Sequence, residues 1–134
     1  MTRSDGQKFG PTASGAVWLD PQRTSPYQIR QFWIQLADVD AVKYLPQFSL
    51  SSLDEVRALI AENALAPEKR IVQRHLATEL TTLVHGAVAA QHAEAAADIL
   101  FGADPMTASL EALRTVAAEV PTTVVARTDL DDVF

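Results

Sequence analysis

Apolar residues recur at helical spacing through most of the chain, and this pattern predicts the elements of the fold. The first helix is expected to begin after Ser25 and Pro26, a capping hydroxyl and a proline that suits the first turn. Its inward face is predicted from apolar residues at positions i, i+3, i+4 and i+7. These residues are Ile29, Phe32, Trp33 and Leu36.

A short second helix is predicted next, with Asp38 and Asp40 as its capping residues. Pro46 is expected to limit this helix, because the residue before a proline avoids the helical region. Its apolar residues are Val42, Tyr44 and Leu45.

Two longer helices are predicted in the middle of the chain. Ser52 and Glu55 form a capping-box pattern that opens a helix ending near Asn63. Pro67 is expected to start the longest helix, which Gly86 kinks or ends. The residues expected to face inward are Val56, Leu59 and Ile60 in the first helix, and Val72, Leu76, Leu80, Leu83 and Val84 in the second.

An alanine-rich helix is predicted up to Phe101, with Gly102 in the usual position after a helix end. A turn at Asp104 and Pro105 then leads to a helix that Pro121 stops. The apolar residues of this last helix are Leu110, Leu113 and Ala117. These patterns predict an all-α fold, a bundle of five or six helices with an N-terminal loop rich in glycine and proline.

The end of the chain carries a β-branched run, residues 122–126, followed by a helix start at Thr128 and Asp131. Only one turn separates this start from Phe134, and an isolated turn of helix is not stable. We therefore expect the parent chain to continue.

Composition and charge narrow the class of protein. The chain has 134 residues, 48% of them apolar, which suits one packed domain, and it has no cysteine for a disulfide or a thiolate zinc site. It shows no apolar run of about 18 residues and no signal-peptide pattern, so a soluble cytoplasmic protein with no membrane partner is expected. The net charge of −6 argues against general nucleic-acid binding but leaves room for a local basic patch.

Residues 1–24 hold enough glycine and proline to predict a loop. Within it Lys8 could reach a phosphate while the glycines allow the backbone to approach, although spacing alone favours an ordinary exposed lysine. Residues 17–19, Val-Trp-Leu, are interpreted as an apolar plug that pins the loop to the domain.

Other candidate residues have ordinary structural explanations. His75, His85 and His92 are not spaced as ligands on adjacent helical turns, so no metal site is predicted. Asp38 and Asp40 could be an acid–base pair, but helix capping explains both. Trp18 and Trp33 could stack bases, but a core or plug role is favoured for both.

A basic cluster on the longest predicted helix is a further candidate. Arg70 and Arg74 lie four residues apart, next to Lys69, and could contact phosphates. Glu68 and Glu79 make a solvated mixed surface equally plausible.

Ordered motifs along nearly the whole chain resemble the bacterial tyrosyl-tRNA synthetases. They are Asp5-Gly6-x-Lys8-Phe9-Gly10-x-Thr12, then Gly15 to Pro21, Thr24 to Tyr27, Gln31 to Trp33, Ala37-Asp38-x-Asp40, Tyr44-Leu45, and Leu76 to Gly86. A helical interaction domain unrelated to translation would have to match this order by chance.

The resemblance implies a class I aminoacyl-tRNA synthetase that activates tyrosine with ATP, accompanied by Mg²⁺, and then esterifies tRNA, as a homodimer. It implies that Lys8, Phe9, Gly10, Pro11 and Thr12 form the second signature loop of the Lys-Met-Ser-Lys-Ser type. Lysines of this loop, here Lys8, stabilise the pyrophosphate leaving group by fixed positive charge.

The resemblance also implies three regions. Residues 1–24 are the signature loop and a connector, residues 25–126 the helical anticodon-binding domain, and residues 127–134 the start of a linker or helix towards a C-terminal domain. The candidate contacts to tRNA phosphates are Arg30, Lys43, Lys69, Arg70 and Arg74.

Two departures from the family pattern matter. Pro11 stands where the family carries the second lysine of the loop, and losing one stabilising group of this kind lowers a rate by on the order of 10²–10³-fold. The nucleotide-binding fold and its His-Ile-Gly-His-type motif would precede residue 1. We therefore expect a fragment of a tyrosine–tRNA ligase that shows no ATP–pyrophosphate exchange alone. The alternative is a stand-alone, non-catalytic module that binds tRNA.

Overall fold

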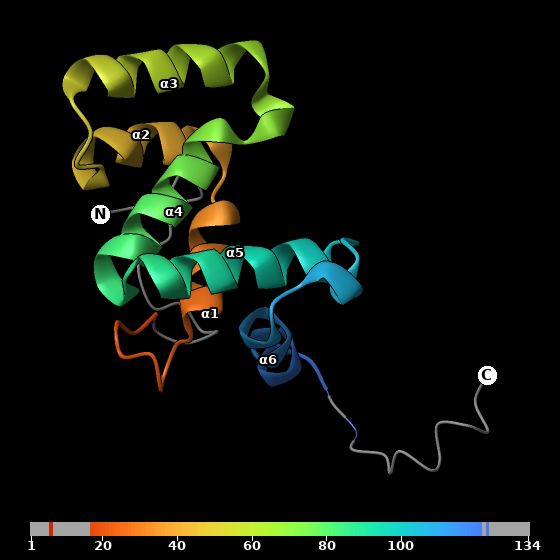
Figure 1. The fold of residues 1–134 in the computed structure, drawn as a ribbon. Helices are drawn as coiled ribbons and strands as arrows, with labels where there is room; N and C mark the ends of the chain where they lie inside the picture. Colours follow the sequence, from red (N-terminus) through yellow and green to blue (C-terminus); the bar gives the residue numbers. More distant parts are fainter. Residues whose placement is uncertain (1–5, 7–16, 122, 124–134) are drawn as a thin grey trace.

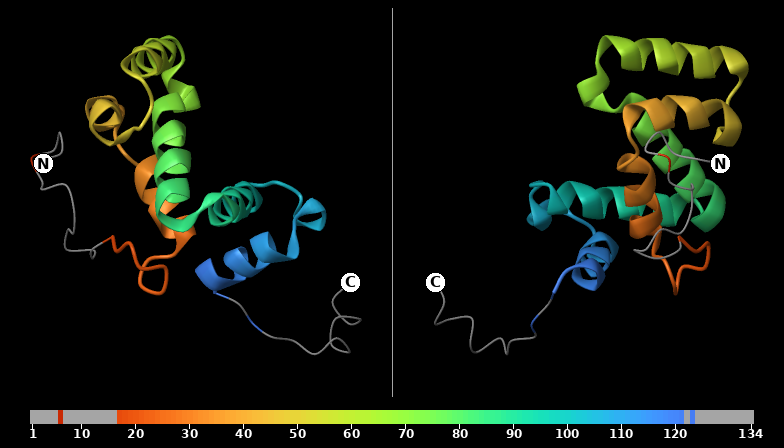
Figure 2. Two further views of the ribbon diagram at one scale, coloured as in Figure 1. Left: turned by 60° about the vertical axis from the view of Figure 1, so that its left-hand side comes forward. Right: turned by 180° about the vertical axis from the view of Figure 1, so that it is seen from behind.

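A computed structural model describes residue 6, residues 17–121 and residue 123. Within these residues the chain forms α-helices and short 3₁₀-helices and no strand, which confirms the all-α prediction. Helices α2 and α3 lie together at one end, α4 runs beside α1, α5 crosses both, and α6 packs on α5 (Figures 1 and 2). The bounds are α1 Pro26–Ile34, α2 Asp38–Phe48, α3 Leu53–Leu65, η1 Pro67–Lys69, α4 Ile71–His85, α5 Ala87–Leu100, η2 Pro105–Thr107 and α6 Leu110–Glu119.

Capping boxes start two of these helices where the sequence predicted them. The Ser25 hydroxyl accepts a hydrogen bond from the Gln28 backbone N–H at the start of α1, and the Gln28 side chain accepts one from the Ser25 N–H. Ser52 and Glu55 form the same reciprocal pair at the start of α3. Each box satisfies backbone donors that have no partner within the helix.

The second helix differs from the prediction at both ends. Its N-cap is Ala37, which has no capping side chain, so Asp38 and Asp40 do not cap it but lie in its first turn. The Asp38 carboxylate instead accepts a hydrogen bond from Gln73 Nε2 of α4, at 2.5 Å. Pro46 does not end the helix, which runs on to Phe48 and contains the proline. Packing of the aromatic ring of Phe48 against Trp33, with centroids 5.2 Å apart, holds this last turn.

Pro67 does not start the longest helix. It opens the 3₁₀-helix η1, and Arg70 then takes a left-handed conformation, φ 52°, before α4 begins. Helix α4 is still the longest, with 15 residues. Gly86 ends it at φ 85°, a conformation that suits glycine, and α5 begins at the next residue.

The later elements agree with the prediction. Helix α5 ends at Leu100, with Phe101 as its C-cap and Gly102 in a positive-φ conformation after it. Ser109 then caps α6 by accepting a hydrogen bond from the Ala112 N–H. The far end of α6 returns to the start of α1, where Glu119 accepts hydrogen bonds from the side chains of Ser25 and Gln28.

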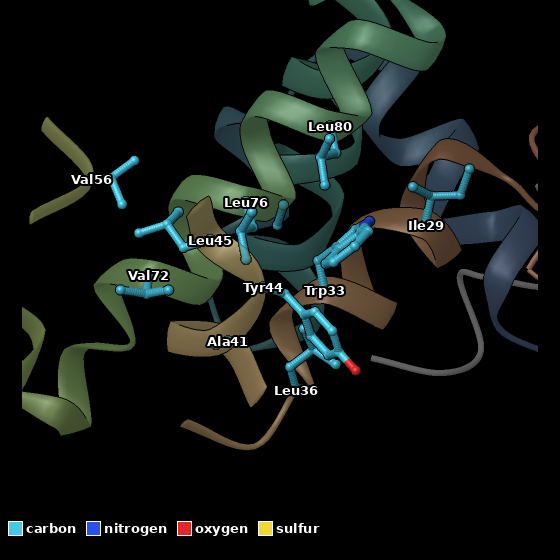
Figure 3. Packing of buried hydrophobic residues seen from close by; sticks show 11 residues of the cluster. Ile29, Trp33, Leu36, Ala41, Tyr44, Leu45, Val56, Val72, Leu76 and Leu80 are labelled. Atoms are coloured by element: carbon cyan, nitrogen blue, oxygen red, sulfur yellow. The ribbon is translucent and has the colours of Figure 1, made fainter. Parts of the chain in front are cut away.

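The main core lies where α1, α2 and α4 meet, with one residue from α3 (Figure 3). Aromatic and leucine side chains fill it, and burying each of these side chains contributes about 1.5–3 kcal/mol. Alanines of α5 and α6 form a second, closely packed seam. The core residues are Ile29, Trp33, Leu36, Ala41, Tyr44, Leu45, Val56, Val72, Leu76, Ala77 and Leu80.

Several residues expected inside are exposed. Leu83 of α4 is 60% exposed and Val84 is also at the surface, so the inward stripe of this helix ends at Leu80. Residues 17–19 are exposed as well, so they are not an apolar plug. Trp33 is a core residue as predicted, whereas Trp18 is 43% exposed.

Some predictions fall outside the described residues. These are the loop at residues 8–12, most of the β-branched run at 122–126, and the helix start at 128–131. Among the described helices, none is both long enough and apolar enough to cross a membrane.

Candidate functional site

A tight turn at residues 20–24 lies in the sequence between the predicted phosphate loop and the first helix, α1. The Asp20 backbone carbonyl accepts hydrogen bonds from the N–H groups of Arg23 and Thr24, both at 3.0 Å. The buried Thr24 hydroxyl accepts one from the Trp18 N–H at 2.9 Å. The Arg23 guanidinium lies 3.4 Å from the centre of the Trp18 ring, which is a cation–π contact. The stretch that follows the predicted loop is thus fixed to the start of α1.

Two of the five candidate tRNA-contacting residues, Arg30 and Arg70, use one guanidinium nitrogen to hold helices together. Arg30 of α1 is only 6% exposed, and its Nη2 donates to the Glu94 carboxylate of α5 at 3.0 Å. Arg70, just before α4, donates from Nη2 to the carbonyl oxygens of Ile34 and Leu36, at 2.6 and 2.9 Å. Arg70 therefore closes the C-terminal end of α1, where carbonyls lack helical partners.

The other three candidates present their side chains at the surface. Lys43 of α2, Lys69 of η1 and Arg74 of α4 are all exposed, and the Lys43 ammonium lies 5.3 Å from the centre of the Tyr44 ring. Arg74 lies in the first turns of α4, close to Arg70, which precedes the helix, and both line one cleft. The structure does not bring Lys43 into that cleft.

The cleft lies between α1, the start of α4 and the end of α5, and it has a volume of about 170 Å³. Three arginines and one aspartate line it, so its charged side chains sum to +2 in a chain of net charge −6. The complete lining is Arg30, Gln31, Ile34, Arg70, Arg74, Ala97, Asp98 and Phe101.

Buried donors without acceptors concentrate at this cleft. Arg30 Nε, Gln31 Nε2 and Arg70 Nε are buried, and none has a hydrogen-bond partner among the described residues. Leaving such a donor unpaired costs about 1–3 kcal/mol each. These atoms have almost no exposed surface, so a group in the cleft would not reach them without a rearrangement of the side chains.

Sequence reasoning singled out the arginines but missed Gln31 and Phe101. In the sequence, Gln31 belongs to a family motif and Phe101 marks the end of a predicted helix, and neither is predicted as a site residue. Phe101 is 79% exposed at the rim of the cleft. No local pattern signals this, because the lining comes from three segments that are distant in sequence.

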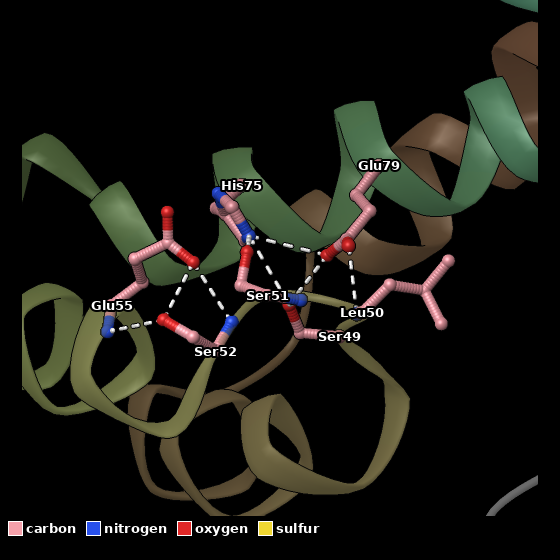
Figure 4. Close-up of polar contacts among 7 residues, drawn as sticks. All are labelled: Ser49, Leu50, Ser51, Ser52, Glu55, His75 and Glu79. Atoms are coloured by element: carbon pink, nitrogen blue, oxygen red, sulfur yellow. Dashed lines mark hydrogen bonds and ion pairs between the residues drawn. The ribbon is translucent and has the colours of Figure 1, made fainter.

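A second polar cluster joins the α2–α3 linker to α4 (Figure 4). The Glu79 carboxylate accepts from the Ser49 hydroxyl at 2.6 Å and the Leu50 N–H at 2.7 Å, and it lies 3.1 Å from His75 Nε2. The same His75 Nε2 also lies 3.3 Å from the hydroxyls of Ser49 and Ser51.

This cluster has a serine, a histidine and a glutamate but not the geometry of a catalytic triad. In a triad the carboxylate binds one imidazole nitrogen and the serine the other. Here Glu79 and Ser49 both face the Nε2 atom of His75. The cluster instead holds the α2–α3 linker against α4.

The remaining histidines do not form a metal site with it. In the part of the chain that the structure describes, no group of three or more His, Cys, Asp or Glu residues could hold a metal ion. Burial lowers the pKa of the His85 imidazole below its ordinary value.

Residues 1–102 match the family model described as tRNA synthetases class I (W and Y). Curated tyrosine–tRNA ligases of bacteria align with most of the chain. That of Roseiflexus castenholzii is 44% identical over 98% of this chain and 31% of its own length. That of Desulfitobacterium hafniense is 52% identical over 75% of this chain and 24% of its own. That of Kineococcus radiotolerans is 47% identical over 97% of this chain and 31% of its own.

Two solved structures are also similar. A C-terminally truncated mitochondrial tyrosyl-tRNA synthetase of Coccidioides posadasii superposes with a TM-score of 0.56 at 39% identity, over 61% of this chain and 23% of that one. The corresponding Aspergillus nidulans structure gives a TM-score of 0.61 at 30% identity, over 64% and 25%. The chain thus spans between a quarter and a third of the length of most of these relatives.

Proposed function

We propose that this chain, which belongs to the family of class I tRNA synthetases for tryptophan and tyrosine, works as part of a tyrosine–tRNA ligase. It would contribute a loop that binds the phosphates of ATP and a helical body that holds the anticodon region of tRNA. The observation that carries this proposal is the alignment with tyrosine–tRNA ligases over 97–98% of the chain at 44–47% identity.

In the proposed ligase, residues 1–24 supply the loop and the connector to α1, and Lys8 is the catalytic cation. Attack of the tyrosine carboxylate on the α-phosphate of ATP expels pyrophosphate, and negative charge develops on that leaving group. A lysine already positioned there stabilises this charge without reorganisation. Phe9, Gly10 and Thr12 would shape the loop backbone around the phosphates, to which Mg²⁺ would be bound.

Pro11 is the residue of the loop that favours a second candidate function. It supplies no positive charge, it lacks a backbone donor, and it stiffens the chain. A module that binds tRNA without chemistry tolerates this residue, whereas a ligase is slowed by the missing cation. Both candidates share the helical domain, for which we propose the bounds 25–126.

For the helical domain we propose a contact with the phosphate backbone through Lys43, Lys69 and Arg74, which are exposed. The Nη2 atoms of Arg30 and Arg70 already bind protein acceptors. These two arginines would therefore contribute their positive charge from inside the cleft. The proposed setting is cytoplasmic translation, with tRNA, ATP and tyrosine as partners of a homodimeric ligase.

Binding of tRNA by the purified chain tests the proposal. Each phosphate contact releases a counterion, so the affinity should fall linearly on a plot of log K against log salt, with a slope of about −0.9 per contact in double-stranded regions. Replacing Lys69 with alanine should make this slope shallower by about one. Replacing Arg114 with alanine removes the same charge from α6 and should leave the slope unchanged. Absence of binding at low salt would contradict both candidate functions.

A further inference from the structure

Two arginines of the cleft between α1, α4 and α5 carry positive charge that no carboxylate of the described residues pairs. Arg70 donates to backbone carbonyls, and the exposed Arg74 has no ion-pair partner in the part of the chain that the structure describes. Arg30 differs, because Glu94 pairs with it. Asp98 lines the cleft without forming an ion pair there to either arginine. The cleft therefore has an excess of positive charge at Arg70 and Arg74.

The chain itself supplies carboxylates after α6, in residues 128–134, which we call the acidic tail. Its sequence is Thr-Asp-Leu-Asp-Asp-Val-Phe, with three aspartates and no basic residue. The aspartates are interspersed with the large apolar residues Leu130, Val133 and Phe134. The cleft combines its arginines with the ring of Phe101, which is 79% exposed at the rim. The acidic tail thus complements the cleft both in charge and in apolar character.

The end of α6 lies close enough to the cleft for the acidic tail to reach it. Glu119, the last residue of α6, accepts a hydrogen bond from the Gln28 side chain at the start of α1. Gln31 and Ile34, which line the cleft, lie about 5 and 9 Å further along α1 at 1.5 Å per residue. Ten residues separate Glu119 from Asp129, and ten residues of extended chain span at most about 33–36 Å. The connection is therefore several times longer than this path requires.

We propose that the acidic tail binds the cleft of its own chain, with its carboxylates facing Arg70 and Arg74 and its apolar side chains against Phe101. The cleft volume of about 170 Å³ equals that of roughly five or six water molecules at ~30 Å³ each, so it admits a short side chain and not a helix. An exposed ion pair is weak by itself. A short covalent connection compensates, because it gives the tail an effective concentration on the order of millimolar. The tail is then a cover that another anion must displace to reach Arg74.

A spin label on the tail tests this contact in the intact 134-residue chain. The chain has no cysteine, so Val133→Cys provides a single position for a nitroxide. The label should broaden the backbone amide signals of Arg74 and Phe101 in ¹H–¹⁵N spectra, and it should leave the signal of Leu53, at the start of α3, sharp. Raising the salt to about 1 M, where the screening length is about 3 Å, should reduce the broadening.

Charge variants of the labelled chain show whether the arginine holds the tail. Arg74→Glu should remove the selective broadening at Phe101. Arg57→Glu makes the same charge change at an exposed position of α3 and should leave the broadening as it is. Replacing the three tail aspartates with asparagine should also remove the broadening, and it changes no residue of the described helices.

Three results would overturn the inference. The first is the absence of selective broadening around the cleft at low salt. The second is broadening that Arg74→Glu and Arg57→Glu leave equally unchanged, since charge would then not hold the tail. The third is broadening of a ¹⁵N-labelled chain by a separate spin-labelled chain mixed with it, since the tail would then bind a second copy. None of these measurements involves tRNA, so the proposed function is tested separately.

Discussion

Glu55 shows how a single side chain fixes the start of a helix. The Ser52 N–H and hydroxyl both donate to its Oε2 atom at 2.8 Å. These bonds, with the backbone bond as the main cause, hold the pKa of the Glu55 carboxyl below its ordinary value of 4.5. The capping box thus favours the charged form of this residue in the folded state.

The stability of the chain should therefore depend on the charge of Glu55. Because the pKa is lower in the folded state, the contribution of this charge is present above pH 4.5 and is lost as pH falls through the folded value. Glu55→Gln should have a lower urea midpoint of unfolding than wild type at about pH 6. The difference in midpoint between the two proteins should be smaller at about pH 3. Glu62→Gln, which removes the same charge from the same helix without touching the capping box, is the matched control. A gap that stays constant with pH would contradict this account.

Local spacing predicts residues such as Glu55, but it does not predict residues whose partners are distant in the sequence. Ser52 and Glu55 are three residues apart, so their capping box is written in the sequence. Asp38 was predicted as a cap because it precedes a helical pattern, but its partner Gln73 lies 35 residues further on. Its role depends on how α2 packs against α4, which no local pattern contains.

At the scale of elements, the proline in α2 is the main departure from helix rules. Pro46 has no N–H to donate to the Val42 carbonyl, and its ring crowds that carbonyl. The helix continues because Tyr44 and Leu45 are fully buried and Phe48 packs against Trp33. Tertiary packing thus keeps Pro46 within the helix, although proline is unfavourable at this position, as the sequence indicates.

Pro46→Ala should stabilise the protein. A proline in a helix interior is unfavourable by about 3 kcal/mol, and the greater freedom of the unfolded alanine chain offsets about 0.4–1 kcal/mol of the gain. The free energy of unfolding in urea should rise by about 2 kcal/mol. Pro26→Ala is the matched control, since proline suits the first turn of α1 and its loss should bring no gain. A Pro46→Ala variant no more stable than wild type would show that α2 is not strained there.

At the scale of the whole molecule, periodicity predicted the helices but not how they meet. The stripe of α4 predicts a buried face from Val72 to Val84, and the structure confirms it only as far as Leu80. The cleft depends on α1, α4 and α5 converging, with side chains as distant as Arg30 and Phe101 on one lining. Resemblance to a family supplied the proposed function, and the loop at residues 8–12 stays a prediction because it lies outside the described residues.

The central claim is that this helical body holds the anticodon region of a tyrosine tRNA. The most direct measurement is the pair of dissociation constants of the chain for a tyrosine tRNA and for the same tRNA with its anticodon bases exchanged, at one fixed salt concentration. The account predicts tighter binding of the unaltered tRNA, because a changed base typically costs a nucleic-acid reader about 1–3 kcal/mol, or roughly 5- to 100-fold. Equal dissociation constants for the two tRNAs would contradict it.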